Sequence, residues 1–116
     1  MISAENVRLV PPRINFIRKS TCPEVNSLVE SVRKYFSQEN IIHDCELVCS
    51  NNEYVKHQGE YGTYLKRHDV SFNLRELKEM NIYHDRIVFR TSEKECSINI
   101  GKDFFYFIDC EEDYYL

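Results

Sequence analysis

The chain has few of the residues that build flexible loops or close around phosphate. Its 116 residues include only three glycines, three prolines and no tryptophan. The sequence contains no glycine-rich phosphate loop, no nucleophile-elbow serine motif and no paired-carboxylate spacing. These absences remove the most recognisable signatures of nucleotide-binding and hydrolytic enzymes, and the low glycine and proline content predicts compact connections.

Long apolar runs and cysteine pairs are also missing. The longest apolar run is the five residues from Phe104 to Ile108, whereas a membrane-spanning helix needs about 20. Residues 1–6 lack the charged-then-apolar pattern of a signal peptide. The five cysteines form no Cys-x-x-Cys motif, which predicts free thiols in a reducing compartment. We therefore expect an intracellular protein, cytoplasmic or nuclear, with no membrane segment and no cofactor.

Positive charge is not in excess. The net charge is −4 and the pI is about 5.6, and residues 102–116 alone carry −4. Nucleic-acid binding depends on a concentrated basic face, so an obligate nucleic-acid partner is disfavoured. An acidic end is better suited to a partner with a basic surface.

What is present predicts a single α+β domain over residues 1–116. We expect a mainly antiparallel sheet with one long amphipathic helix, residues 21–37, packed on one face. Thr21 to Glu24 match a capping box, and apolar residues then recur at helical spacing up to Phe36. A second capping box at Asn73 predicts a short helix over residues 74–80.

Strands are expected on both sides of the long helix. Residues 6–18 predict an edge strand and an inner strand around the Pro11-Pro12 pair. In a strand over residues 41–49, Cys45, Leu47 and Cys49 would share the core-facing side. Residues 54–68 are interpreted as a mobile loop. As an alternative, Tyr54 and Val55 extend a strand that Gly59 and Gly62 break, and Tyr61, Tyr64 and Leu65 start another. Period-two alternation predicts a C-terminal meander of three antiparallel strands over residues 86–91, 96–100 and 104–109.

The last of these strands is apolar on both faces. Phe104, Tyr106 and Ile108 would face the core, which leaves Phe105 and Phe107 on a partly wet face. Residues 110–116 are interpreted either as a frayed end or as an acidic and aromatic docking tail. The predicted partner-binding residues are Phe105, Phe107, Asp109, Glu111, Glu112, Asp113, Tyr114 and Tyr115.

These features favour a small non-enzymatic protein-binding module: a subunit, inhibitor or adaptor. Its partner would be another protein, with a basic surface, or a second copy in a homodimer. The first alternative is a nucleic-acid-binding module that stacks bases on aromatic residues and meets phosphate with cations. Its contacts would be Tyr54, Lys56, Tyr61, Tyr64, Lys66 and Arg67.

The second alternative is a small metal-dependent hydrolase. His43-Asp44, His68-Asp69 and His84-Asp85 are metal-ligand types, but neighbouring strand residues point to opposite faces, so no metal ligand set is assigned. Cys22 lies in the first turn of the long helix, where the helix N-terminus would lower its pKa. No histidine can be paired with it from the sequence, so no catalytic residue is assigned.

Overall fold

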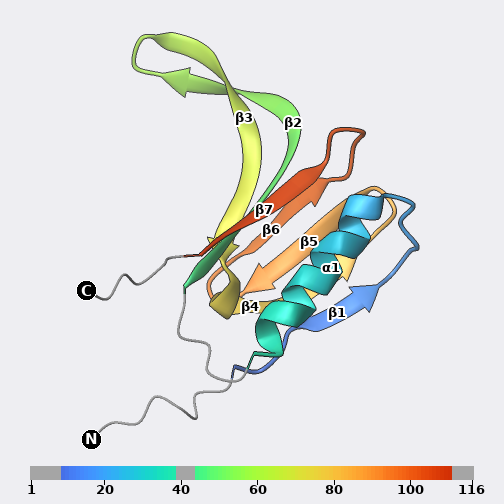
Figure 1. The fold of residues 1–116 in the computed structure, drawn as a ribbon. Helices are drawn as coiled ribbons and strands as arrows, with labels where there is room; N and C mark the ends of the chain where they lie inside the picture. The colour runs from blue at the N-terminus through green and yellow to red at the C-terminus, as the bar shows by residue number, and fades with distance from the viewer. Residues whose placement is uncertain (1–8, 39–43, 111–116) are drawn as a thin grey trace, which may run out of the picture.

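The computed structural model describes residues 9–38 and 44–110 and shows a mostly β protein. Of the described residues, 56% are in strands and 18% in helices, and the strands form two sheets with the orders β1-β4-β5-β6 and β3-β2-β7 (Figure 1). In chain order the elements are β1 (Arg13–Phe16), α1 (Pro23–Phe36), β2 (Cys45–Gly59), β3 (Gly62–Asn73), the 3₁₀ turn η1 (Leu74–Glu76), β4 (Leu77–Ile82), β5 (Arg86–Thr91), β6 (Glu95–Asn99) and β7 (Phe105–Cys110).

The helix α1 forms where its apolar stripe predicts. All six stripe residues are buried: Val25, Leu28, Val29, Val32, Tyr35 and Phe36. The predicted capping box is wrong, because Cys22 is the N-cap residue and makes no side-chain cap bond. Within the two described segments, no helix combines the length and apolar character that a membrane span requires.

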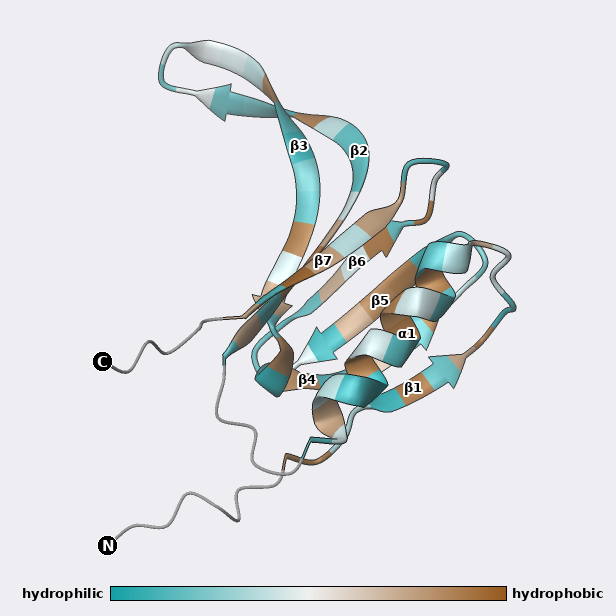
Figure 2. Cartoon of the chain, in the orientation of Figure 1, coloured by the Kyte–Doolittle hydropathy of each residue, from teal (hydrophilic) through white to brown (hydrophobic). Residues whose placement is uncertain are grey.

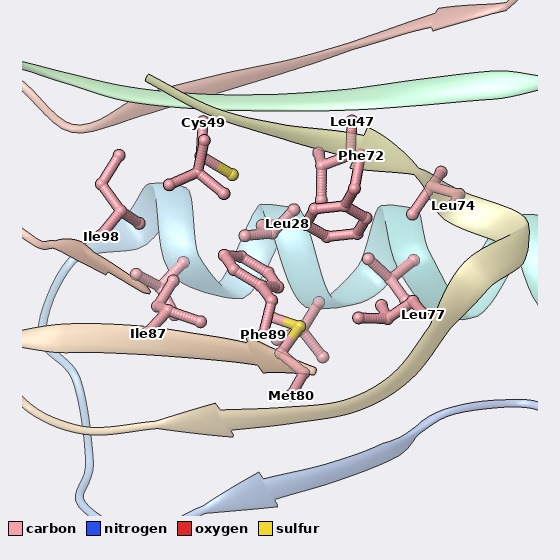
Figure 3. Close-up of a cluster of buried hydrophobic side chains, with 14 of the residues drawn as sticks. Leu28, Leu47, Cys49, Phe72, Leu74, Leu77, Met80, Ile87, Phe89 and Ile98 are labelled. Carbon is pink, nitrogen blue, oxygen red and sulfur yellow. The ribbon is translucent and has the colours of Figure 1, made fainter. Parts of the chain in front are cut away.

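The core lies where the inner faces of both sheets meet α1. Figure 3 shows Phe72 and Phe89 at its centre, with Leu28 reaching in from α1. The two rings lie 5.0 Å apart, and Phe89 is fully buried. Hydroxyls of Ser27 and Ser31 lie 2.6 and 2.9 Å from the Tyr106 hydroxyl, which ties α1 to β7. Core-facing Cys45, Leu47 and Cys49 are buried, as the alternation of the strand predicted.

The predicted fold class is wrong in its sheet arrangement. The chain does not form one sheet covered by a helix, and the C-terminal strands do not form a meander. β5 and β6 pair with each other, but β7 leaves their sheet and pairs antiparallel with β2, from Cys45↔Cys110 to Ser50↔Phe105. Register between strands so distant in the sequence is set by tertiary packing, which local alternation does not report.

The predicted second helix is also wrong. Asn73 does cap a turn, since its side chain accepts a hydrogen bond from the Arg75 N–H, but the turn covers only residues 74–76. Leu77 then starts β4, which pairs antiparallel with β5 and parallel with β1. The i, i+3 spacing of Leu74 and Leu77 fits one tight turn as well as a helix. Residues 77–82 form a strand because β1 and β5 pair with both edges of β4.

A disulfide joins β2 and β7. Cys45 and Cys110 are bonded, whereas Cys22, Cys49 and Cys96 are free. The prediction that all thiols are free is therefore wrong for this pair. The two cysteines are register partners in neighbouring strands, a proximity that their 65-residue sequence separation conceals.

Candidate partner-binding surface

The long β2–β3 hairpin projects from the body of the protein (Figure 1). We define the arm as residues 54–67, which pair from Tyr54↔Arg67 to the turn at Gly59↔Gly62. Every residue from 52 to 69 is exposed. The prediction of a mobile loop over residues 54–68 is therefore wrong, because these residues form a two-stranded ribbon with solvent on both faces.

An anchored bulge sets the base of the arm. Between the pairs Ser50↔Asp69 and Tyr54↔Arg67, three residues of β2 oppose one residue of β3. Asn52 has a positive φ of 60° there, and the buried Asn51 side chain donates a 2.9 Å hydrogen bond to the Asn99 carbonyl. Bulges bend a strand and increase its local twist, so this one directs the arm away from the body.

Both faces of the arm combine apolar and basic side chains. Register partners point to the same side of a sheet, so Tyr54, Lys56, Leu65 and Arg67 share one face, while Val55, His57, Tyr64 and Lys66 share the other. The His57 and Tyr64 rings stack at 5.8 Å, in agreement with this register. Leu65 is 64% exposed.

The tip of the arm is a tight turn. Glu60 and Tyr61 connect the strands, and Gly62 has a φ of +123°, a conformation that side-chain-bearing residues rarely adopt. Tyr61 is 98% exposed. The turn therefore holds a whole aromatic side chain in water at the farthest point of the arm.

The second exposed apolar surface lies on the outer side of β7 and β2. We call it the Phe107 face: Glu46, Val48, Phe105, Phe107 and Asp109, which share one side of the sheet by register. Phe107 is 48% exposed, while Phe105 and Val48 are half-buried. The opposite side of β7 packs Tyr106 and Ile108 on the core, and Phe104, directly before the strand, is buried there. The two-faced character predicted for this strand is thus present.

The arm and the Phe107 face adjoin each other. The Arg67 guanidinium lies 5.7 Å from the centre of the Phe105 ring and also bonds the Asp69 carboxylate at 3.1 Å. In Figure 2 the apolar colour is concentrated on the body strands and α1, while the arm is mainly polar or neutral with isolated apolar positions. The arm is therefore an amphipathic surface and the Phe107 face a more apolar one.

The far end of the Phe107 face is acidic. Glu46 and Asp109 are register partners on the same side of the sheet, and both are exposed. Neither forms an ion pair among the residues that the structure describes. Like charges directly opposite each other on neighbouring strands repel, so a cation brought to this place would be stabilised.

The structure brings together only some of the predicted contact residues. Phe105, Phe107 and Asp109 share one face, but the rest of the predicted set, residues 111–115, lies outside the described residues. The predicted nucleic-acid contacts are divided: Tyr54, Lys56 and Arg67 on one face of the arm, Tyr64 and Lys66 on the other, and Tyr61 at the tip. Glu46, Val48, Val55 and Leu65 were not assigned from the sequence. Period-two alternation through residues 41–49 places Glu46 and Val48 on the side opposite the core, whereas the arm has no core-facing side whose alternation could mark Val55 and Leu65.

The histidine–aspartate pairs make no metal site among residues 9–38 and 44–110, where no group of three ligand-type side chains comes together. His84 and Asp85 are an exposed pair 4.0 Å apart. His68 lies 3.5 Å from the Ser97 carbonyl. His43 lies outside the described residues.

A polar groove of about 420 Å³ on the outer face of the four-stranded sheet contains Glu79, Arg86 and Arg90. The hydrogen bond from Arg90 is the largest cause that lowers the Glu79 pKa, with a further contribution from the Arg13 charge. A carboxylate held ionised by two guanidinium groups is unsuited to accept or donate a proton near neutral pH. This groove therefore shows no acid–base pair.

The free thiols are not activated. Burial, followed by the hydrogen bond that Cys22 Sγ donates to the Glu24 carboxylate, raises the Cys22 pKa, so the lowered value expected at the helix N-terminus is wrong. Burial, followed by the nearby Cys96, raises the pKa of Cys49 to about 12. Because the folded pKa of Cys49 is raised, its contribution to stability is complete below about pH 9, the ordinary value, and is lost as the pH rises towards 12.

We expect the three thiols to react at different rates. At pH 8, a maleimide should modify the partly exposed Cys22 and Cys96 in the folded protein, because a thiolate at an accessible site is the reacting species. Cys49 should react only after denaturant unfolds the chain. Mass spectrometry of labelled peptides measures this order, and rapid labelling of Cys49 in native buffer would contradict the buried position of its thiol.

The fold and site define a two-sheet, mostly β protein with a projecting β-ribbon and an adjoining apolar face. No protein-family model, no curated protein and no solved structure matches the chain. The arm and the Phe107 face are therefore the features of this chain from which a function can be inferred.

Proposed function

We propose that this chain is a non-enzymatic protein-binding module that uses the arm and the Phe107 face as its recognition surface. The observation that carries the proposal is the arm. A two-stranded ribbon in water is marginally stable by itself, and this one exposes Tyr54, Val55, Tyr61, Tyr64 and Leu65 without cover from the body. Binding a partner would remove these side chains from water and stabilise the ribbon.

The composition of the surface supports a protein partner. Interfaces are enriched in tyrosine, phenylalanine and arginine at their centres, and the arm and the Phe107 face supply all three. Single-stranded nucleic acid needs cations and stacking rings along one continuous groove, whereas the arm divides them over two faces. A subunit, inhibitor or adaptor role fits a surface on which residues 9–38 and 44–110 form no catalytic constellation.

The oxidation state of the cysteines bears on the cellular compartment of the protein. The predicted intracellular location depended on the missing signal-peptide pattern and on free thiols. Disulfides are rare in the cytosol and nucleus, so the Cys45–Cys110 bond favours an oxidising compartment over these two.

Replacing Leu65 or Phe107 by serine should weaken partner binding about 5- to 30-fold, as expected for contact residues worth about 1–2 kcal/mol. Both side chains are exposed, so the free energy of unfolding should change by less than about 1 kcal/mol. Affinity capture from the native source with mass identification finds the partner, and titration calorimetry then measures the affinity of each variant.

The matched control is Ile17→Ser. Ile17 is 51% exposed, close to Phe107 at 48%, but lies beyond β1 and away from the arm. The Ile17→Ser substitution should leave partner binding unchanged. Equal binding by wild type and Leu65→Ser, or unfolding caused by Phe107→Ser, would show that these side chains do not form a recognition surface.

A further inference from the structure

The arm and the Phe107 face have complementary charge. Within the arm, Lys56, Lys66 and Arg67 against Glu60 give a net charge of +2, and the rest of the chain carries −6, for a total of −4. Arg67 is already paired with Asp69 at the base of the arm, so Lys56 and Lys66 are the arm cations left for a partner. The Phe107 face ends in Glu46 and Asp109, whose carboxylates lie opposite each other with no cation paired to them among the described residues. One chain thus contains both a basic amphipathic surface and an acidic apolar one.

The arm cannot satisfy these carboxylates within its own chain. Lys56 lies ten residues beyond Glu46 along the same strand, up to about 33 Å away at ~3.3 Å per residue. The arm continues the sheet beyond Phe105, while the carboxylates lie at the other end of β7. An arm cation that reaches these carboxylates must therefore come from a second molecule.

We propose that the partner is a second copy of this chain, in a two-fold dimer in which each arm lies across the Phe107 face of the other. This assignment rests on the proposed function and names its partner. Because both surfaces belong to every copy at the same separation, one two-fold rotation can make both contacts at once. Each contact places Leu65 or Tyr54 near Phe107 and brings Lys56, which shares their face of the arm, to Glu46 and Asp109. Lys66 lies on the other face and contributes through the net charge of the arm.

Charge reversal tests the pairing directly. Lys56→Glu with Lys66→Glu makes the arm acidic, and Glu46→Lys with Asp109→Lys makes the face basic. Sedimentation velocity should show that the wild type is a dimer whose affinity falls as salt rises. Each double variant should dimerise about tenfold more weakly, which corresponds to ~1.4 kcal/mol. All four positions are exposed, so the circular dichroism spectrum should be unchanged, and so should the Tm at dilutions where wild type and variants are both monomeric.

Mixing the two double variants is the decisive step. In an equimolar mixture, each acidic arm meets a basic face and each basic arm meets an acidic face, so a 1:1 heterodimer should form with affinity restored towards that of the wild type. The control Lys34→Glu with Lys78→Glu reverses the same amount of charge on α1 and β4 and should leave the wild-type dimer unchanged.

Three results would overturn this assignment. One is a wild type that stays monomeric at its highest attainable concentration, and another is a mixture of the double variants that does not associate. The third is a monomeric wild type that binds a single-stranded oligonucleotide through Lys56 and Lys66, which would assign the arm to nucleic acid. A fourth outcome separates the two proposals: the wild type is monomeric but binds a different protein, and Leu65→Ser abolishes that binding. The dimer would then be excluded, whereas the proposed protein-binding function would stand.

Discussion

Replacing Phe89 by alanine is expected to lower the free energy of unfolding by about 3–5 kcal/mol, the range for removing a buried phenylalanine. Phe89 is fully buried at the centre of the core, against Phe72, and lies where both sheets and α1 meet. The cavity left by the phenyl ring would be lined by both sheets and by α1. These elements cannot all shift inwards to fill it, so the cost of the cavity remains. Since a domain is stabilised by only about 5–15 kcal/mol, this one change would approach the limit of folding.

Chemical denaturation measures the effect, and Val88→Ala is the matched control on the same strand. Val88 is half-buried on the opposite, outer side of β5, so its truncation should cost much less. A loss below about 1 kcal/mol for Phe89→Ala would be typical of a surface position, and would contradict a core centred on Phe72 and Phe89.

Replacing Cys110 by serine is expected to cost about 2–4 kcal/mol, because a cross-link that closes a long loop restricts the unfolded chain. The bond between Cys45 and Cys110 spans 65 residues and joins the β2–β7 pair that the Phe107 face occupies. For a domain of this size we expect a Tm decrease on the order of 10 °C. Differential scanning calorimetry measures it.

The reduced wild type provides the control for Cys110→Ser. With reductant present, wild type and variant should melt at nearly the same temperature, whereas the oxidised wild type should melt higher. An oxidised wild type that melts with the variant would show that the disulfide does not stabilise the fold.

The sequence predicted features that depend on local periodicity. The stripe from Val25 to Phe36 predicted α1 because a helix buries residues at i, i+3 and i+4. Alternation predicted that Phe104 would face the core and Phe107 the solvent, and both positions are found so. These patterns report which side of an element is covered, and that was sufficient to identify Phe107 as an exposed apolar residue.

The sequence did not predict which strands pair. β7 follows β6 directly but pairs with β2, more than fifty residues earlier. Nothing in the alternation of Phe105 to Asp109 distinguishes these two partners. The disulfide was missed for the same reason, because Cys45 and Cys110 become neighbours only through this pairing.

The arm was missed for a different physical reason. A strand is recognised when one face is apolar and the other polar, but both faces of the arm mix Tyr54 or Tyr64 with Lys56 or Lys66. Gly59 and Gly62 were interpreted as strand breakers, whereas they are the paired residues on either side of a tight turn. A ribbon without a core-facing side lacks the pattern by which a strand is predicted, and the same property leaves it available to a partner.

Amide hydrogen exchange across a protein concentration series tests the role of the arm most directly. In the dilute monomer, amides of residues 54–67 should exchange rapidly, because a ribbon exposed on both faces opens locally at low cost. As the dimer fraction rises, these amides should gain protection in proportion, while those of β5 stay protected throughout. Exchange in the arm that is independent of concentration, in samples that sedimentation shows to be dimeric, would contradict an interface built on the arm.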